Sequence, residues 1–222
     1  MASQTDICNM ALGFIGVSIT IGDITEQSAA AIACNQFWAI TQDYCLRQNY
    51  WRFASYRQTL QPLANPPQNW GYVYPVPADC LKIKRLTVVG LRNPRADQRI
   101  PFETAAVAGI GKVIYTDQNP AELQYTAEIN DPTQWDSTFC IAFAYLLGSF
   151  IAMSLSSTPQ IASQARAAFE QTCALAIAQD LIEGQDDPAP DCAFIAEREG
   201  YGPQSFSPNG AGNLTPASFY VG

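Results

Sequence analysis

The spacing of apolar residues changes twice along this chain, and these changes constrain the fold more than any other feature of the sequence. Apolar side chains recur every three or four residues up to about Trp51, which predicts helices. Short extended segments separated by turns follow as far as Ile129, and helical spacing returns from Asp131 to about Glu183. The sequence therefore predicts a β region that interrupts a set of helices.

Two helices are predicted before the β region. Ser3 or Thr5 can cap the first, and the second runs from a cap at Thr25 to about Gln48. Between them, Gly13 and Gly16 are expected to end the first helix.

Two more helices are predicted after the β region. Asp131 followed by Pro132 is a typical helix start, and we expect that helix to continue to about Ser157. A further helix is expected from Thr158 to about Glu183, where Gly184 ends it.

The middle of the chain holds six extended segments, most of them bounded by proline, glycine or asparagine turns. The strand candidates are residues 53–60, 72–77, 81–89, 99–102, 112–116 and 122–129.

Together these segments predict an α+β fold that is mainly an α-helical bundle. The predicted domains are a bundle of residues 1–50 and 131–183, a small antiparallel β insertion of residues 51–130, and an extended C-terminal arm of residues 184–222. The arm contains five prolines and six glycines, yet it also carries aromatic residues. A purely solvating tail has few aromatics, so we expect this arm to become ordered on a partner.

The chain contains no histidine, which excludes Ser-His-Asp and Cys-His catalysis and any zinc site with a histidine ligand. Its formal charge of −8 argues against general binding to nucleic acid. Seven scattered cysteines without a Cys-x-x-Cys pair favour buried free thiols in a reducing compartment.

No secretion signal or membrane span is predicted. The N-terminus lacks a basic region, and the most apolar stretch, Phe139 to Leu155, is shorter than the ~20 residues of a typical span. We therefore expect a soluble protein made in the cytoplasm.

No pattern in the sequence marks a catalytic, cofactor or metal site. Acidic pairs such as Asp23 with Glu26 are better explained as helix-start residues. The segment that begins at Asp186 lacks the order of a calcium loop, and Gly109 to Lys112 lacks the pattern of a phosphate loop. We expect no catalytic residue, no cofactor and no metal.

A basic cluster is the sharpest charge feature, because it holds half of the 12 cations within 18 positions. Only Asp97 opposes it, and no aromatic residue is interleaved, which argues against a stacking platform for single strands. The cluster faces either an acidic protein surface, such as a neighbouring copy's acidic tail, or a phosphate backbone; the acidic balance elsewhere favours protein. Its residues are Lys82, Lys84, Arg85, Arg92, Arg95 and Arg99.

Residues 5 to 85 carry a succession of motifs that resembles the head-to-tail adaptor proteins of short-tailed bacteriophages, which are called tail tubular protein A in some of them. The motifs are Asn9-x-Ala11-Leu12, Asp23-x-x-Glu26-x-Ser28-x-x-Ala31-x-x-Cys34, Trp51-Arg52-Phe53-Ala54 and Trp70-Gly71-Tyr72-x-Tyr74-x-x-Pro77-x-Asp79-Cys80-Leu81.

This resemblance implies a structural virion protein at the head–tail junction, without a catalytic step. Such adaptors form a ring of twelve copies that joins the portal protein to the tail nozzle protein and continues the DNA channel, so that DNA passes through without sequence-specific binding. Their fold is a helical bundle with a β insertion and a C-terminal extension that reaches the portal. The expected portal anchors in this chain are Tyr201, Phe206, Phe219 and Tyr220.

Two other functions remain open from the residues alone. One is a virion-associated glycosidase that degrades peptidoglycan, since such an enzyme needs only two carboxylates. The other is a host-directed binding protein that is not part of the virion.

Overall fold

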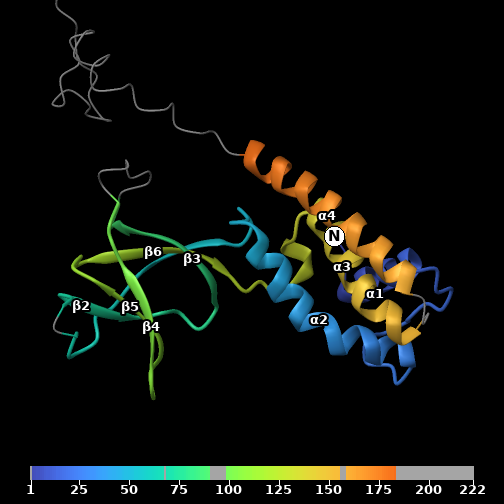
Figure 1. Cartoon of the computed structure of the whole chain (residues 1–222), viewed down its shortest axis with the longest axis horizontal. Coiled ribbons are helices and arrows are strands. Elements are labelled where there is room, and N and C mark those ends of the chain that lie inside the picture. Colours follow the sequence, from blue (N-terminus) through green and yellow to red (C-terminus); the bar gives the residue numbers. More distant parts are fainter. Residues whose placement is uncertain (1, 68, 91–98, 156–158, 184–222) are drawn as a thin grey trace, which may run out of the picture. The chain divides into compact units, whose positions relative to one another are not determined.

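The computed structural model describes residues 2–67, 69–90, 99–155 and 159–183. The chain divides into two units at Gln185, and the second unit, Asp186–Gly222, lies outside the described residues. The elements (Figure 1) are α1 (Gln4–Phe14), α2 (Ala29–Gln48), β1 (Ser55–Thr59), β2 (Tyr72–Pro75), β3 (Cys80–Val88), β4 (Glu103–Val107), β5 (Gly111–Thr116), β6 (Ala121–Ala127), the 3₁₀ turn η2 (Pro132–Gln134), α3 (Ser137–Leu155) and α4 (Pro159–Ile182).

Helix α1 begins at Ser3, one of the two predicted caps. The Ser3 hydroxyl accepts a hydrogen bond from the backbone N–H of Asp6, while the Asp6 carboxylate accepts one from the N–H of Ser3. This reciprocal pair satisfies backbone donors that the first turn leaves without helical partners.

Helix α2 begins later than predicted, with Ser28 rather than Thr25 as its cap. Thr25 instead donates its hydroxyl to Asp23, and the Glu26 carboxylate accepts the backbone N–H groups of Gly22 and Asp23. These side-chain bonds hold a turn that competes with the first turn of a helix, so the helix starts only after it.

Two other boundaries differ from the prediction. Asp131 caps only the short turn η2, and α3 follows from Ser137. The strand expected at residues 99–102 lies instead at Glu103–Val107, where it pairs with β5. The remaining strands overlap their predicted segments.

The six strands of the described residues form two antiparallel sheets. One has the order β1-β6-β3, and the other has the order β2-β5-β4. Strand β6 pairs with β1 over Ser55↔Thr126 to Thr59↔Glu122, which joins segments about seventy residues apart. It pairs on its other side with β3, where two register shifts interrupt the ladder.

The expectation of a mainly helical bundle with a small β insertion is wrong. The described chain is a mixed α/β fold of four helices and two three-stranded antiparallel sheets. The sheets share the hydrophobic core of the helices, since the strand residues Tyr74, Leu86, Ile114 and Leu123 belong to the same buried cluster as the helices. This architecture also departs from the mainly helical fold that the family resemblance implies.

Helix α3 is the central helix of the described chain, because it packs against α1, α2 and α4. By length and composition alone it could cross a membrane. However, Phe139, Phe143, Leu147 and Ile151 are all buried on it, as expected for the core helix of a globular fold.

Aromatic side chains join α3 to the segment that leads into the sheets. Phe139 meets Trp51 and Phe53 with ring centroids 5.0 Å apart in each case, and Trp135 packs on Phe139 at 5.3 Å. The Trp51 indole N–H also donates to the backbone oxygen of Cys45 at 3.0 Å. Edge-to-face contacts of this kind add to the stability gained from burial alone.

Several residues of the family-like motifs have structural roles in this fold. The Asn9 side chain both donates to and accepts from the backbone of Ile21, at 2.9 and 2.8 Å. Cys34 is buried on α2, and Asp79 accepts a hydrogen bond from the hydroxyl of Tyr125 at 3.1 Å. These motif residues therefore stabilise turns and packing.

The predicted free thiols are confirmed for the six cysteines in the described residues, of which all except Cys80 are buried.

The close approach of α3 to α1 gives a testable prediction. A Cβ added at Gly148 would lie 3.2 Å from both the Ala11 carbonyl oxygen and the buried Ile15 side chain. We expect Gly148→Ala to lower the free energy of unfolding by about 1–3 kcal/mol, because the tightly packed helices must separate. Denaturant unfolding measures this change.

Gly13→Ala is the matched control, since Gly13 also lies in a helix but has no atom within 4 Å of the added methyl. It should be neutral or stabilising by about 0.5–1 kcal/mol. Equal effects of the two substitutions would contradict the packing described for α1 and α3.

Candidate interaction surface

The β1-β6-β3 sheet has one polar face and one apolar face. Residues paired across neighbouring strands share a face, and alternate residues along a strand point to opposite faces. We define the polar face by the residues that the register places together, which are Ser55, Arg57, Thr59, Lys82, Arg85, Thr87, Glu122, Gln124 and Thr126.

The opposite face belongs to the core. Tyr125 and Leu123 of β6 pair with Ile83 and Leu86 of β3. Three of these four side chains are buried, and Ile83 packs against the core cluster. The apolar face therefore fixes the sheet in the fold. On the polar face, Arg57 and Thr59 are exposed, whereas Thr87, Gln124 and Thr126 are buried.

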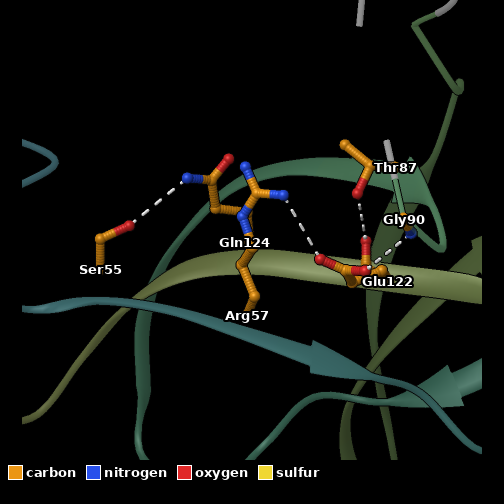
Figure 2. A network of polar contacts seen from close by, with 6 residues as sticks. All are labelled: Ser55, Arg57, Thr87, Gly90, Glu122 and Gln124. Carbon is orange, nitrogen blue, oxygen red and sulfur yellow. Dashed lines mark hydrogen bonds and ion pairs between the residues drawn. The ribbon is translucent and has the colours of Figure 1, made fainter. Parts of the chain in front are cut away.

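Figure 2 shows a chain of weak polar contacts across the polar face. The Gln124 amide nitrogen lies 3.4 Å from the Ser55 hydroxyl, and the Arg57 guanidinium lies 3.5 Å from the Glu122 carboxylate. The Thr87 hydroxyl donates to the backbone oxygen of Glu122 at 3.4 Å, and the Gly90 N–H donates to the Glu122 carboxylate at 3.5 Å. All four contacts are near the long limit for such interactions, so this network is loosely satisfied.

Two polar atoms at the centre of this face have no hydrogen bond at all. Gln124 is 8% exposed and Thr126 is 1% exposed, and neither Gln124 Oε1 nor Thr126 Oγ1 has a partner among the described residues. Buried polar atoms are almost always paired, because losing water without a replacement costs about 1–3 kcal/mol. The centre of the polar face thus has unused hydrogen-bonding capacity.

The structure places Lys82 and Lys84 against the same aromatic ring. Their ammonium nitrogens lie 4.3 and 5.5 Å from the ring centroid of Tyr50, within the range of cation–π attraction. The Tyr50 hydroxyl donates to the backbone oxygen of Ile83, and Lys82 donates to the backbone oxygen of Arg47, both at 3.0 Å. Tyr50, which lies outside the cluster in the sequence, therefore supplies an aromatic ring beside these two lysines.

Arg85 and Arg99 also come together, and they do so with Arg57. Burial lowers the pKa of Arg85, and the neighbouring positive charges of Arg57 and Arg99 lower it further. Burial likewise lowers the pKa of Lys84, with added repulsion from Arg85 and Arg52. These cations are close enough to repel one another, and Glu122 is the carboxylate on the polar face that opposes them.

Three further cations, Arg47, Arg52 and Arg57, lie in the same region of the structure and were not part of the basic cluster predicted from the sequence. Arg52 binds the end of α4. Its side-chain Nε donates to the backbone oxygen of Asp180 at 2.6 Å, and its backbone N–H donates to the Asp180 carboxylate at 2.8 Å. These residues lie 25 or more positions before the cluster. The pairing of both β1 and β3 with β6 brings Arg57 beside Arg85. We call the described cations of this region, Arg47, Arg52, Arg57, Lys82, Lys84, Arg85 and Arg99, the basic surface.

The remaining predicted site residues lie outside the described residues. They are Arg92 and Arg95 of the basic cluster and the proposed arm anchors Tyr201, Phe206, Phe219 and Tyr220.

A cavity of about 140 Å³ lies beside Trp51 and Trp135 and includes the carboxylates of Asp136, Asp180 and Glu183. It is smaller than the ~300 Å³ at which small-molecule pockets begin. Asp136 accepts the backbone N–H of Thr138, and Asp180 is held by Arg52, so both carboxylates already have structural contacts. Within the described residues, no group of three or more His, Cys, Asp or Glu side chains is arranged so that it could hold a metal ion.

The chain matches no protein-family model and no curated protein sequence. The functional argument therefore rests on the residues and their geometry.

The contacts of Tyr50 lead to a testable prediction. Tyr50→Phe removes only the hydrogen bond to Ile83 and should lower the free energy of unfolding by about 0.5–1.5 kcal/mol. Tyr50→Leu also removes the ring beneath the two lysines and should cost about 0.5–1 kcal/mol more. Denaturant unfolding of both variants measures the difference.

A double-mutant cycle isolates the contribution of the lysine. In the Tyr50→Leu background, Lys82→Met should destabilise less than it does in the wild-type chain. Equal losses in both backgrounds would show that the ring does not stabilise the cation.

Proposed function

We propose that this protein is a structural virion protein, an adaptor whose ring joins the portal protein to the tail nozzle protein of a short-tailed bacteriophage and continues the DNA channel. The proposal places it at the head–tail junction, after synthesis in the cytoplasm of the bacterial host. It takes the number of copies, twelve, from the family resemblance alone.

The observation that carries the proposal is the exposure of large apolar side chains on α2 and α4. Ile40 is 61% exposed on α2, and Leu175, Leu181 and Ile182 are 55%, 60% and 81% exposed on α4. Burying one such side chain against a partner stabilises a complex by about 1.5–3 kcal/mol before association costs are counted. The exposed apolar side chains on α2 and α4 therefore support the proposal that other subunits cover these helices.

The low charge content supports the same proposal. Only 14% of the residues are charged, against about a quarter in a typical protein. A subunit of a closed ring makes head-to-tail contacts through two different surfaces, so much of its exterior is removed from water.

The charge distribution is compatible with DNA passage. A chain with a net charge of −8 neutralises few phosphates outside its basic surface, so duplex DNA is not retained along the channel. Under this proposal the basic surface contacts protein.

The C-terminal arm supplies the portal anchors in this proposal. The aromatic residues Tyr201, Phe206, Phe219 and Tyr220 bind the portal, and a ring of such arms binds multivalently.

Electron microscopy of this protein mixed with the portal protein of the same phage tests the proposal. We expect a ring of density on the portal, and we expect substitution of the four arm aromatics by serine to weaken its attachment at least about tenfold because multivalent contacts are lost. Substituting the neighbouring hydroxyl residues by alanine is the matched control and should leave the ring in place; these are Ser205, Ser207, Thr215 and Ser218.

Absence of a ring with the wild-type chain would contradict the adaptor function. Release of peptidoglycan fragments by the purified protein would favour the glycosidase instead. A ring that survives the loss of all four aromatics would retain the adaptor and reject the arm as its anchor.

A further inference from the structure

The cavity beside Trp51 combines an aromatic floor with an acidic rim. Three aromatic and three acidic residues form these two parts, namely Trp51, Phe53, Trp135, Asp136, Asp180 and Glu183. Its volume of about 140 Å³ is close to that of an engineered cavity of about 150 Å³ that holds benzene. The cavity therefore has room for a group of about six non-hydrogen atoms, such as the end of one long side chain.

The floor of the cavity is held in one position. The indole N–H groups of Trp51 and Trp135 each donate to a backbone oxygen at 3.0 Å. Both rings also pack on Phe139, with centroids 5.0 and 5.3 Å apart. Because these N–H groups are already bonded, the floor offers a ligand a fixed carbon surface rather than hydrogen-bond donors.

The rim carries three carboxylates that have no cationic partner among the described residues. Asp136 directly precedes α3, Asp180 lies in the last turn of α4, and Glu183 follows that helix. Within the described chain, none of the three belongs to an ion pair. Arg52 donates its side-chain N–H groups to the backbone oxygens of Asp180 and Leu181 instead. Each carboxylate therefore keeps acceptor sites for a further donor.

Two of these acids stand at the end of a helix where acids are unfavourable. The C-terminal end of a helix carries partial negative charge, so basic residues stabilise it and acidic residues destabilise it. The last turn of α4 contains no basic residue, and Asp180 and Glu183 lie at this end. A cation bound at the rim would relieve this repulsion.

An organic cation fits the cavity better than a metal ion does. The acids of the described residues are not arranged so that they could hold a metal ion, and aromatic carbon offers no metal ligand. A cationic group on a methylene stem uses both parts of the cavity, because the stem packs on the aromatic floor while the charged end donates to the carboxylates.

We propose that this cavity binds an ammonium or guanidinium group on a short apolar stem, as found at the end of a lysine or arginine side chain. The stem lies against Trp51 and Trp135, and the charged end meets Asp136, Asp180 and Glu183. The site does not depend on the adaptor function, because a basic side chain of any partner protein or a free amine has this chemistry.

NMR titration of the full chain with n-butylammonium and n-butylguanidinium tests the inference, with n-butanol as the neutral probe. The four tryptophan indole N–H signals report on the site. We expect those of Trp51 and Trp135 to shift, while that of Trp70, which bonds to Glu103, stays in place. The dissociation constants should be on the order of 1–10 mM for ligands this small. We expect n-butanol to bind at least about tenfold more weakly, because it lacks charge-assisted hydrogen bonds.

Neutral variants of the rim test the role of its carboxylates. Asp136→Asn combined with Glu183→Gln keeps the shapes of both side chains, and asparagine can still accept the N–H of Thr138. This double variant should bind n-butylammonium at least about tenfold more weakly. Asp43→Asn combined with Glu128→Gln is the matched control, since it changes the net charge equally at exposed positions outside the cavity, and it should bind like the wild type.

Glu183→Gln alone separates ligand binding from a role in folding. It should weaken n-butylammonium binding and yet raise the melting temperature, because it removes an acid from the negative end of α4. A lower melting temperature would overturn the inference and assign this carboxylate to the stability of the fold.

Equal binding of n-butanol and n-butylammonium would overturn the inference, and so would unchanged binding in the rim variant or an equal loss in its control. Shifts of Trp70 as large as those of Trp51 would also overturn it, because they would show binding without a site.

The portal experiment distinguishes the two sources of the cation. Weaker ring formation by the rim variant would assign the cavity to a basic side chain of a partner protein, whereas an unchanged ring would assign it to a free amine. Binding of n-butylammonium by a chain that forms no ring on the portal would support this inference and reject the adaptor function.

Discussion

The two-sided pairing of strand β6 is the constraint on which the rest of the structure depends. Its partner β1 directly follows the first pair of helices, and its other partner, β3, is the strand that bears Lys82 to Arg85. Because side chains alternate along β6, Leu123 and Tyr125 enter the core while Glu122 and Gln124 face the cations. One strand thereby secures the sheet to the core and forms the centre of the polar face.

The sequence predicted the positions of most elements better than their assembly. The cap at Ser3 and the helical spacing of α3 were predicted because they are local signals. Asp131, which was expected to start the long helix, caps only η2. The large share of the fold that the two sheets form was not predicted. Most residues of Ser55–Thr59 are exposed, and this segment is a strand because it pairs with β6, which lies far along the chain. The start of α2 shifted for a similar reason, since the contacts of Glu26 favour a turn.

The candidate surface was predicted in part. Lys82, Lys84, Arg85 and Arg99 were found because they are close in sequence. Arg57 was missed because only the sheet register brings it opposite Gln124, and Tyr50 was missed because its contact with the lysines crosses from the end of α2 to β3. Closeness in sequence therefore revealed only the part of the basic surface that lies on and after β3, and not the residues that come from β1 and from the region of α2.

Zero-length carbodiimide cross-linking of a mixture of ¹⁴N- and ¹⁵N-labelled chains, assembled on the portal, tests the central claim most directly. It joins lysine ammonium groups to carboxylates that form salt bridges. The account of a ring of adjoining copies predicts mixed-isotope peptides that join a lysine of one copy to a carboxylate of another. Cross-links that are confined to a single copy would contradict it.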